Sequence, residues 1–393
     1  MTFYRYWLLC LWLVSGWAHA HNLGTSYSQW QLSESGASVT ARISQLQLSR
    51  LQLDPRYTEQ YAEKVATLLA RDLQLWAEKQ RCTTHEAKAG IEADGWVSAR
   101  WHVDCPSAQP WTLRTRLLEN VAPSHLHFVR IDTPQQPTQQ RVLNFAHPSL
   151  TLGANAPEAN SLQQFIGIGL NHILSGWDHL AFILMLILLA PRLRDVVWLA
   201  TGFTLAHSLT LAAASLGWLI VDQARIEALI GFSIALVAAE NLWLQSASDP
   251  WIPRLLLITL IGVAGLGLFT SDLGQLPLLL SLLVFTTCYF GLLASAPHPQ
   301  RWRLALTFIF GLIHGFGFAG LMGELALPAE QFLPGLLGFN LGVELGQILI
   351  IALIWPLLHL LRRFPHVAAW SSQGVSAAVA GLGIFWFLTR LLV

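Results

Sequence analysis

Ionisable side chains stand within the most apolar part of this sequence. A charge inside a membrane costs about 2.5–3.5 kcal/mol, so such residues are candidates for function. Imidazole and carboxylate groups suit Ni²⁺, Co²⁺, Zn²⁺, Fe²⁺ or Mn²⁺, whereas Cu⁺ prefers sulfur, which is scarce here. The sequence therefore predicts a divalent-metal site built from the apolar segments. The candidate ligands are His172, Asp178, His179, His207, Glu240, His314 and Glu344.

The first apolar segment holds three of these candidates in a short stretch. His172 and His179 share a helix face, but about 10 Å of helix separates residues seven apart. On a straight helix the two imidazoles cannot bind the same ion. Two arrangements remain open: the residues are successive stations along a path, or the helix breaks between them. Ser175 and Gly176 lie in this interval, and such pairs are common kink sites.

The surrounding composition is typical of a membrane protein. Charged residues make up 12% of the chain, about half the share of a soluble domain, and the mean hydropathy is +0.47. The formal net charge of zero argues against nucleic acid as a partner. We predict an all-α membrane domain over 162–393, with the lipid bilayer as its partner. Its eight expected spans are about 162–190, 195–219, 225–245, 254–271, 274–295, 302–325, 331–360 and 371–392.

An arginine bias predicts the orientation of these spans. Seven arginines fall in or beside the connections on one side of the expected membrane, and two on the other. Positive residues favour the cytoplasmic side, so this bias places the N-terminal domain in the periplasm and the chain in a bacterial inner membrane. The seven are Arg192, Arg194, Arg254, Arg301, Arg303, Arg362 and Arg363, and the two are Arg225 and Arg390.

Residues 1–20 have the features of a secretory signal peptide. Arg5 precedes a short apolar core, and residues 18–20 (Ala-His-Ala) have the small-x-small form of a cleavage site. Cleavage there would make His21 the mature N-terminus, where the free amine and the imidazole could chelate copper or nickel. A favourable cleavage context explains the same residues without a metal.

Residues 21–150 are expected to form a periplasmic, β-sandwich-like domain with one inserted helix, followed by a linker over 151–161. Alternation of apolar and polar residues predicts strands, and a helical spacing of apolar residues predicts one helix over 58–79. The strands are expected at 25–32, 38–48, 96–103, 111–118 and 125–131.

Cysteine and histidine add two expectations for this exported domain. Cys82 and Cys105 are its even pair in an oxidising compartment, so we predict that they form a disulfide. His125 and His127 are two apart and would share one face of a strand. That pair is a weak metal candidate, and a solvated strand face is the competing interpretation.

The stretch from His172 to His179 reads H-x5-D-H and resembles the signature of the HupE/UreJ family of bacterial membrane proteins. The resemblance to this family extends to the segments 165–172, 202–210 and 314–317, and it covers about 160–393 in all. It implies uptake of nickel, or sometimes cobalt, with His172, Asp178 and His179 selecting the metal. A second family motif, F-H-G-x-[AV]-H-G-x-E, is reduced here to the His-Gly pair at 314 and 315.

Three kinds of function remain compatible with these residues. The first is a permease or binding protein for a divalent metal, with nickel or cobalt favoured and zinc also possible, and with a periplasmic metal donor as a potential partner. The second is an intramembrane zinc hydrolase in which Glu240 or Glu344 activates water. The third is a haem-b carrier with axial His207 and His314, or an accessory assembly protein. We expect a transporter rather than an enzyme, and the absence of a Walker A sequence indicates passive or ion-coupled transport.

Overall fold

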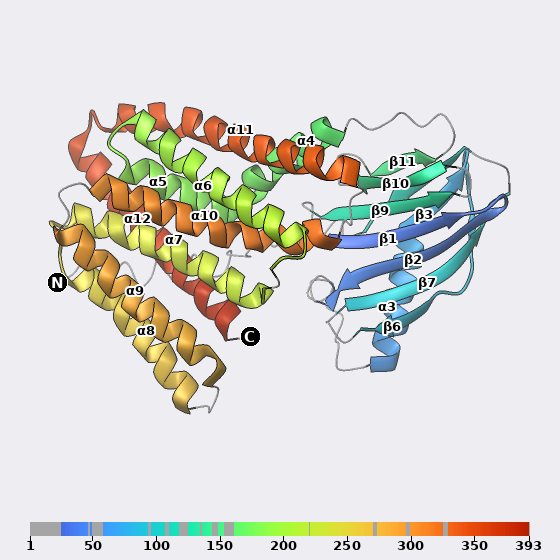
Figure 1. Cartoon of the computed structure of the whole chain (residues 1–393), viewed down its shortest axis with the longest axis horizontal. Coiled ribbons are helices and arrows are strands. Elements are labelled where there is room, and N and C mark those ends of the chain that lie inside the picture. Colours follow the sequence, from blue (N-terminus) through green and yellow to red (C-terminus); the bar gives the residue numbers. More distant parts are fainter. Residues whose placement is uncertain are drawn as a thin grey trace. The chain divides into compact units, whose positions relative to one another are not determined.

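The computed structural model of the chain describes most of its residues, in two compact units. A β-rich unit lies between residues 25 and 152, and a helical unit lies between 161 and 392 (Figure 1). Residues 1–24, with the predicted signal peptide and His21, lie outside the described residues, as does most of the predicted linker. Described are residues 25–45, 48, 58–92, 96–106, 110–117, 125–133, 136–143, 148–152, 161–219, 221–269, 273–295, 299–324 and 329–392.

The β-rich unit contains two sheets. The larger has the strand order β10-β9-β1-β2-β7-β5, with β6 also paired to β7, and the smaller has the order β11-β8-β3-β4. β1 runs parallel to β9 and antiparallel to β2. The strands are β1 (Thr25–Leu32), β2 (Gly36–Ser44), β3 (Leu73–Ala77), β4 (Gln80–Arg81), β5 (Thr83–Thr84), β6 (Lys88–Ile91), β7 (Trp96–Asp104), β8 (Trp111–Thr115), β9 (Leu126–Thr133), β10 (Gln136–Leu143) and β11 (Ser149–Leu152).

Both sheets and helix α3 (Thr58–Asp72) contribute to one apolar core, in which Trp30, Trp111 and Leu69 are fully buried. A β-rich region is therefore confirmed, and α3 is a helix inserted between its described strands. The predicted helix over 58–79 is wrong in its last part, because residues 73–77 form β3. Every residue of this short run except Trp76 is buried, and the run pairs antiparallel with β8, which satisfies its backbone groups in the core. The predicted strand over 38–48 also ends early, at the end of β2.

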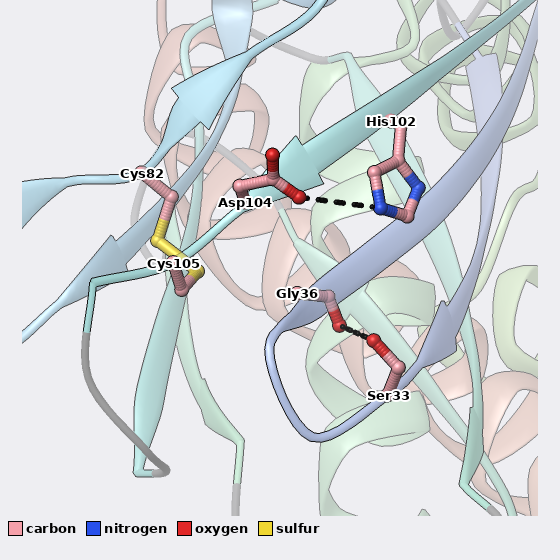
Figure 2. Close-up of a disulfide and its surroundings, with 6 residues drawn as sticks. All are labelled: Ser33, Gly36, Cys82, His102, Asp104 and Cys105. Carbon is pink, nitrogen blue, oxygen red and sulfur yellow. Dashed lines mark hydrogen bonds and ion pairs between the residues drawn. A yellow bond between two sulfur atoms is a disulfide. The ribbon is translucent and has the colours of Figure 1, made fainter.

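Cys82 and Cys105 form a disulfide, as the sequence predicted. The bridge joins the residue before β5 to the residue after β7, where these two strands pair antiparallel (Figure 2). Beside it, the Ser33 hydroxyl donates to the Gly36 carbonyl across the turn between β1 and β2, at 3.1 Å. The disulfide therefore holds together the edge of the larger sheet.

The helical unit contains six helices long and apolar enough to cross a membrane, namely α6, α7, α8, α9, α11 and α12. Helices α4 and α5 pass the same criterion together as one bent pair, which gives up to seven spans in the described part of the chain. The eight spans stay a prediction, because α10 is not among these candidates. The helices are α4 (Ser161–Ser175), α5 (Trp177–Leu189), α6 (Leu193–Ser215), α7 (Gln223–Gln245), α8 (Trp251–Phe269), α9 (Leu276–Ser295), α10 (Pro299–Glu324), α11 (Ala329–Leu361) and α12 (Pro365–Leu391).

Three helix pairs make the most extensive contacts: α6 with α10, α7 with α12, and α4 with α11 (Figure 1). Glycines permit this close approach. A Cβ on Gly311 of α10 would lie 2.4 Å from the Phe203 carbonyl oxygen on α6, and one on Gly342 of α11 would lie 2.1 Å from the Ile166 carbonyl oxygen on α4. Small residues of this kind bring helix backbones into contact within membranes. The backbone spacing within each pair is therefore fixed.

Removing the disulfide should destabilise the β-rich unit. The cysteines are 23 residues apart, and closing a loop of that length is worth about 3 kcal/mol in the chain-entropy description. We expect a variant with Cys82→Ser and Cys105→Ser to melt at a lower temperature than the wild type in detergent, and dithiothreitol to lower only the wild type. Cys288→Ser is the matched control, since that cysteine is free and exposed. Equal melting of wild type and double variant would contradict the expectation.

Candidate metal site

The helix formed by the first apolar segment is broken between its two histidines. Helix α4 ends at Ser175, α5 begins at Trp177, and the two are bent by 73°. The Ser175 hydroxyl donates to the Asn171 carbonyl at 2.6 Å. As a result, the rings of His172 and His179 have centres 4.5 Å apart, instead of about 10 Å along a straight helix. Of the two arrangements left open by the sequence, the broken helix is confirmed.

Gly176 is the residue at the break, and it has no room for a side chain. A Cβ there would lie 2.7 Å from Nδ1 of His179, 2.9 Å from the His172 carbonyl oxygen and 3.0 Å from Oδ1 of Asp178. The backbone N–H of Gly176 still donates to that His172 carbonyl, at 3.1 Å. The bend therefore depends on glycine for steric space.

Four buried imidazoles gather around this break. His172 comes from α4, His179 from α5, His207 from α6 and His314 from α10. The ring centres of His172 and His207 are 6.4 Å apart, and those of His179 and His314 are 5.6 Å apart. Four helices therefore bring together histidines that are up to 142 positions apart in the chain.

Phenylalanines surround the imidazoles. The Phe203 and Phe182 rings lie 4.9 Å and 5.3 Å from the His314 ring, and the Phe339 ring lies 5.4 Å from the His172 ring. Sequence reasoning did not select these residues. A signal was present, because Phe203 and His207, like Phe310 and His314, are four residues apart and so share a helix face. The apolar rings separate the imidazoles from water.

Hydrogen bonds fix the protonation pattern of two of the imidazoles. His179 donates through Nδ1 to Oδ1 of Asp178 at 3.0 Å, and its backbone N–H donates to the same oxygen at 2.9 Å. His314 donates through Nδ1 to the Phe310 carbonyl oxygen at 2.9 Å. A carbonyl or carboxylate oxygen can only accept, so in each neutral ring the proton is on Nδ1 and the lone pair is on Nε2.

The two Nε2 atoms, on His179 and His314, are buried and have no hydrogen-bond partner among the described residues. A buried polar atom left unpaired costs about 1–3 kcal/mol. A metal ion could take both lone pairs, since Nε2 is a common metal ligand. In the described part of the chain, however, no three His, Cys, Asp or Glu side chains converge closely enough to hold an ion. The rings are near one another, but their donor atoms do not form a cage.

The two glutamates predicted for the same site have hydrogen-bond partners of their own. Glu344 of α11 accepts a hydrogen bond from the Thr201 hydroxyl of α6 at 2.7 Å. Thr201 is six residues from His207, which is about 9 Å along the helix. Glu240 of α7 pairs with Arg303, Nε to Oε1, at 2.6 Å. Both carboxylates are therefore engaged with partners other than the four imidazoles.

Arg303 also departs from the sequence expectation. The sequence predicts it at a membrane connection, but it lies inside α10 and is 8% exposed. Its guanidinium lies beside the buried Glu240 carboxylate, so it does not contribute to a cytoplasmic surface. The arginine bias that predicts orientation therefore depends on the other six residues on that side.

His125 and His127 lie in the β-rich unit and are both buried, so the solvated strand face is wrong. The Ser26 hydroxyl lies 2.7 Å from Nε2 of His125 and 2.7 Å from Nδ1 of His127. The other nitrogen of His127 lies 2.8 Å from the Ser28 hydroxyl. Burial, followed by the neighbouring His125, lowers the pKa of His127 to about 3. Both nitrogens of His127 are thus occupied, which makes it a poor metal ligand.

Two further histidines, not selected from the sequence, share one carboxylate on the surface of the β-rich unit. Asp104 lies 3.3 Å from Nε2 of His102 (Figure 2). It also lies 2.6 Å from Nε2 of His85, and all three side chains are about half exposed. The hydrogen bond from His85 lowers the pKa of the Asp104 carboxyl. These contacts are explained as ordinary surface pairing next to the disulfide.

Filling the space at Gly176 should disturb the break. We expect Gly176→Ala to lower the stability of the purified protein by about 1–3 kcal/mol, because the new methyl group collides with an imidazole and a backbone carbonyl. Melting in detergent measures this. Gly167→Ala is the matched control on the same bent span, since a Cβ there meets no atom within 4 Å. Equal shifts for the two variants would refute the steric role of Gly176.

Acid should weaken the β-rich unit through His127. Its folded pKa of about 3 is below the ordinary 6.5, so the unfolded chain binds the proton first and stability falls as the pH drops below 6.5. The expected loss between pH 7.5 and pH 5 is about 2 kcal/mol. Hydrogen–deuterium exchange of peptides from β1 and β9, corrected for intrinsic rates, measures it in the full chain. His127→Gln should flatten this dependence, and an unchanged profile would contradict the assignment.

The comparisons with known proteins bear on the helical unit. The family described as HupE / UreJ protein matches residues 149–292 and 281–390, which together are more than half of the chain. No curated protein matches the chain. The family match includes the broken helix and all four buried histidines, together with the apolar candidate spans. The chain therefore belongs to the HupE/UreJ family of membrane proteins.

Proposed function

We propose that the chain is a membrane permease for a divalent transition metal, with nickel or cobalt the favoured substrate. One observation carries the proposal. Two buried imidazoles on different helices, His179 and His314, have Nδ1 engaged and Nε2 free of partners among the described residues. Membership of the HupE/UreJ family supports the same conclusion, because this family is associated with nickel or cobalt handling.

The chemistry of the group suits a borderline divalent ion. Neutral imidazole nitrogens bind Ni²⁺, Co²⁺ and Zn²⁺ at about 2.0–2.1 Å, and the partly buried carboxylate of Asp178 offsets part of the cationic charge. Asp178 also orients the ligand His179, because its hydrogen bond to Nδ1 directs Nε2 of that ring away from the carboxylate. We assign His172 and His207 as further ligands, and Glu344 as a neighbouring position along the path of the ion.

Transport also requires release of the ion. The imidazoles lie within reach of one another without converging, and an ion would draw their donors together by side-chain rotation. A site of this kind does not trap its ion in a preformed cage. The proposal includes the orientation inferred from the sequence: an inner-membrane protein with a cleaved signal peptide and a periplasmic N-terminal domain.

The competing functions gain no support from these contacts. A zinc hydrolase would need a carboxylate free to activate water. The Glu240 carboxylate accepts hydrogen bonds from Arg303 and Tyr289, and the Glu344 carboxylate accepts one from Thr201. A haem carrier would leave the Asp178–His179 pair without a role. The permease accounts for that pair and for the partnerless nitrogens together.

Whole-cell elemental analysis tests the proposal. Cells expressing the wild type should accumulate one metal from a medium with trace Ni, Co, Zn, Mn, Fe and Cu. Asp178→Asn should reduce this accumulation about 10- to 100-fold at equal protein level, because it removes the charge that orients and supports His179. His359→Ala is the control, an exposed histidine far along α11. If no metal rises with the wild type, the permease is excluded.

A further inference from the structure

A polar layer on α7 contacts both helices that supply the partnerless nitrogens. Glu240 accepts hydrogen bonds from Nε of Arg303 on α10 and from the Tyr289 hydroxyl on α9, both at 2.6 Å. The next residue, Asn241, donates through Nδ2 to the Met185 carbonyl oxygen on α5 at 3.0 Å. Helix α5 carries His179, and α10 carries His314.

These residues are too far from the imidazoles to bind the same ion. Met185 is six residues from His179, about 9 Å along α5, and Arg303 is eleven residues from His314, about 16 Å along α10. Glu240 is fully buried and Arg303 nearly so, and the two are paired through Nε and Oε1. The layer therefore acts on the site through the helices that it joins.

Directional bonds give this layer control over helix position. Within lipid the hydrophobic effect does not drive helices together, so interhelical hydrogen bonds add a directional constraint to van der Waals packing. A buried ion pair contributes little net stability but penalises any rearrangement that separates the charges. Two adjacent residues of α7 thus fix α5 and α10 relative to one common helix.

We propose that Glu240, Asn241 and Arg303 form a clamp that sets the spacing between His179 and His314, and with it the metal affinity and preference of the site. This inference rests on the proposed function. It gives Glu240 a positioning role in place of the ligand role predicted from the sequence. The clamp has an α5 arm, the bond from Asn241 to Met185, and an α10 arm, the Glu240–Arg303 pair. Without one of these arms α5 or α10 can shift, and the two Nε2 atoms then cannot bind one ion together.

Cobalt binding to the purified full-length protein in detergent tests the clamp. Asn241→Ala removes the α5 arm, and Glu240→Met with Arg303→Met removes the α10 arm without leaving a buried unpaired charge. Each is expected to weaken Co²⁺ binding about 2- to 30-fold, the range for residues coupled to a site through packing. Each should also change the visible absorption of bound Co²⁺, which reports coordination geometry and would not respond to a lower yield of folded protein.

A second ion pair on the same helix provides the matched control. Glu227 of α7 pairs with Arg390 of α12 at 3.0 Å, and α12 carries none of the four histidines. Glu227→Gln should leave both Co²⁺ affinity and absorption at wild-type values. Tyr289→Phe serves as a milder clamp variant, since it removes one hydroxyl and keeps the ring. It should shift affinity in the same direction by a smaller factor.

The outcomes separate the two proposals. If the wild type binds Co²⁺, His179→Ala does not, and the clamp variants match the wild type in affinity and absorption, the clamp is wrong and the metal site stands. If the wild type and His179→Ala are alike in failing to bind Co²⁺, the metal site fails and the clamp loses its function with it. An equal effect from Glu227→Gln would also overturn the clamp, because it would indicate general loosening of α7.

Discussion

The break between α4 and α5 is the feature on which the rest of the site depends. An unbroken helix would separate His172 from His179 by about two turns, and no packing of neighbours could bring both to one point. The 73° bend removes that separation. It requires Gly176, because any Cβ there would occupy the space of the His179 ring and the His172 carbonyl. One residue without a side chain thus makes a four-histidine group possible.

The same break determines where charge can be held. Asp178 lies in the first turn of α5, where the unpaired backbone N–H groups and the helix dipole stabilise an anion. Its oxygen accepts from the backbone and the ring of His179, so a costly membrane carboxylate has two donors. A helix that continued through residue 176 would bond those N–H groups internally and leave the carboxylate without them. The bend, the anion and the orientation of the imidazole therefore have one cause.

Local pattern predicted those parts of the molecule that local forces determine. The strand over 25–32, the disulfide and a break near Ser175 follow from alternation, compartment and residue type. The residues 73–77 were misassigned because a short apolar run fits the end of a helix and a buried strand equally well, and only pairing with β8 decides between them. Glu240 was assigned to the metal group because sequence gives its depth and not its facing helix. Its partner Arg303 is 63 residues away.

The four imidazoles differ in how firmly helix packing holds them in place. His207 and His314 belong to α6 and α10, whose backbones meet at Gly311, so their relative position is set by direct backbone contact. His172 belongs to the α4–α11 pair, which is packed in the same way. Helix α5, with His179, belongs to neither pair. Its position depends on the bend at one end and on side-chain bonds such as Asn241 to Met185 along its length. Of the four imidazoles, His179 is therefore the one whose position the protein can change at the lowest cost in packing.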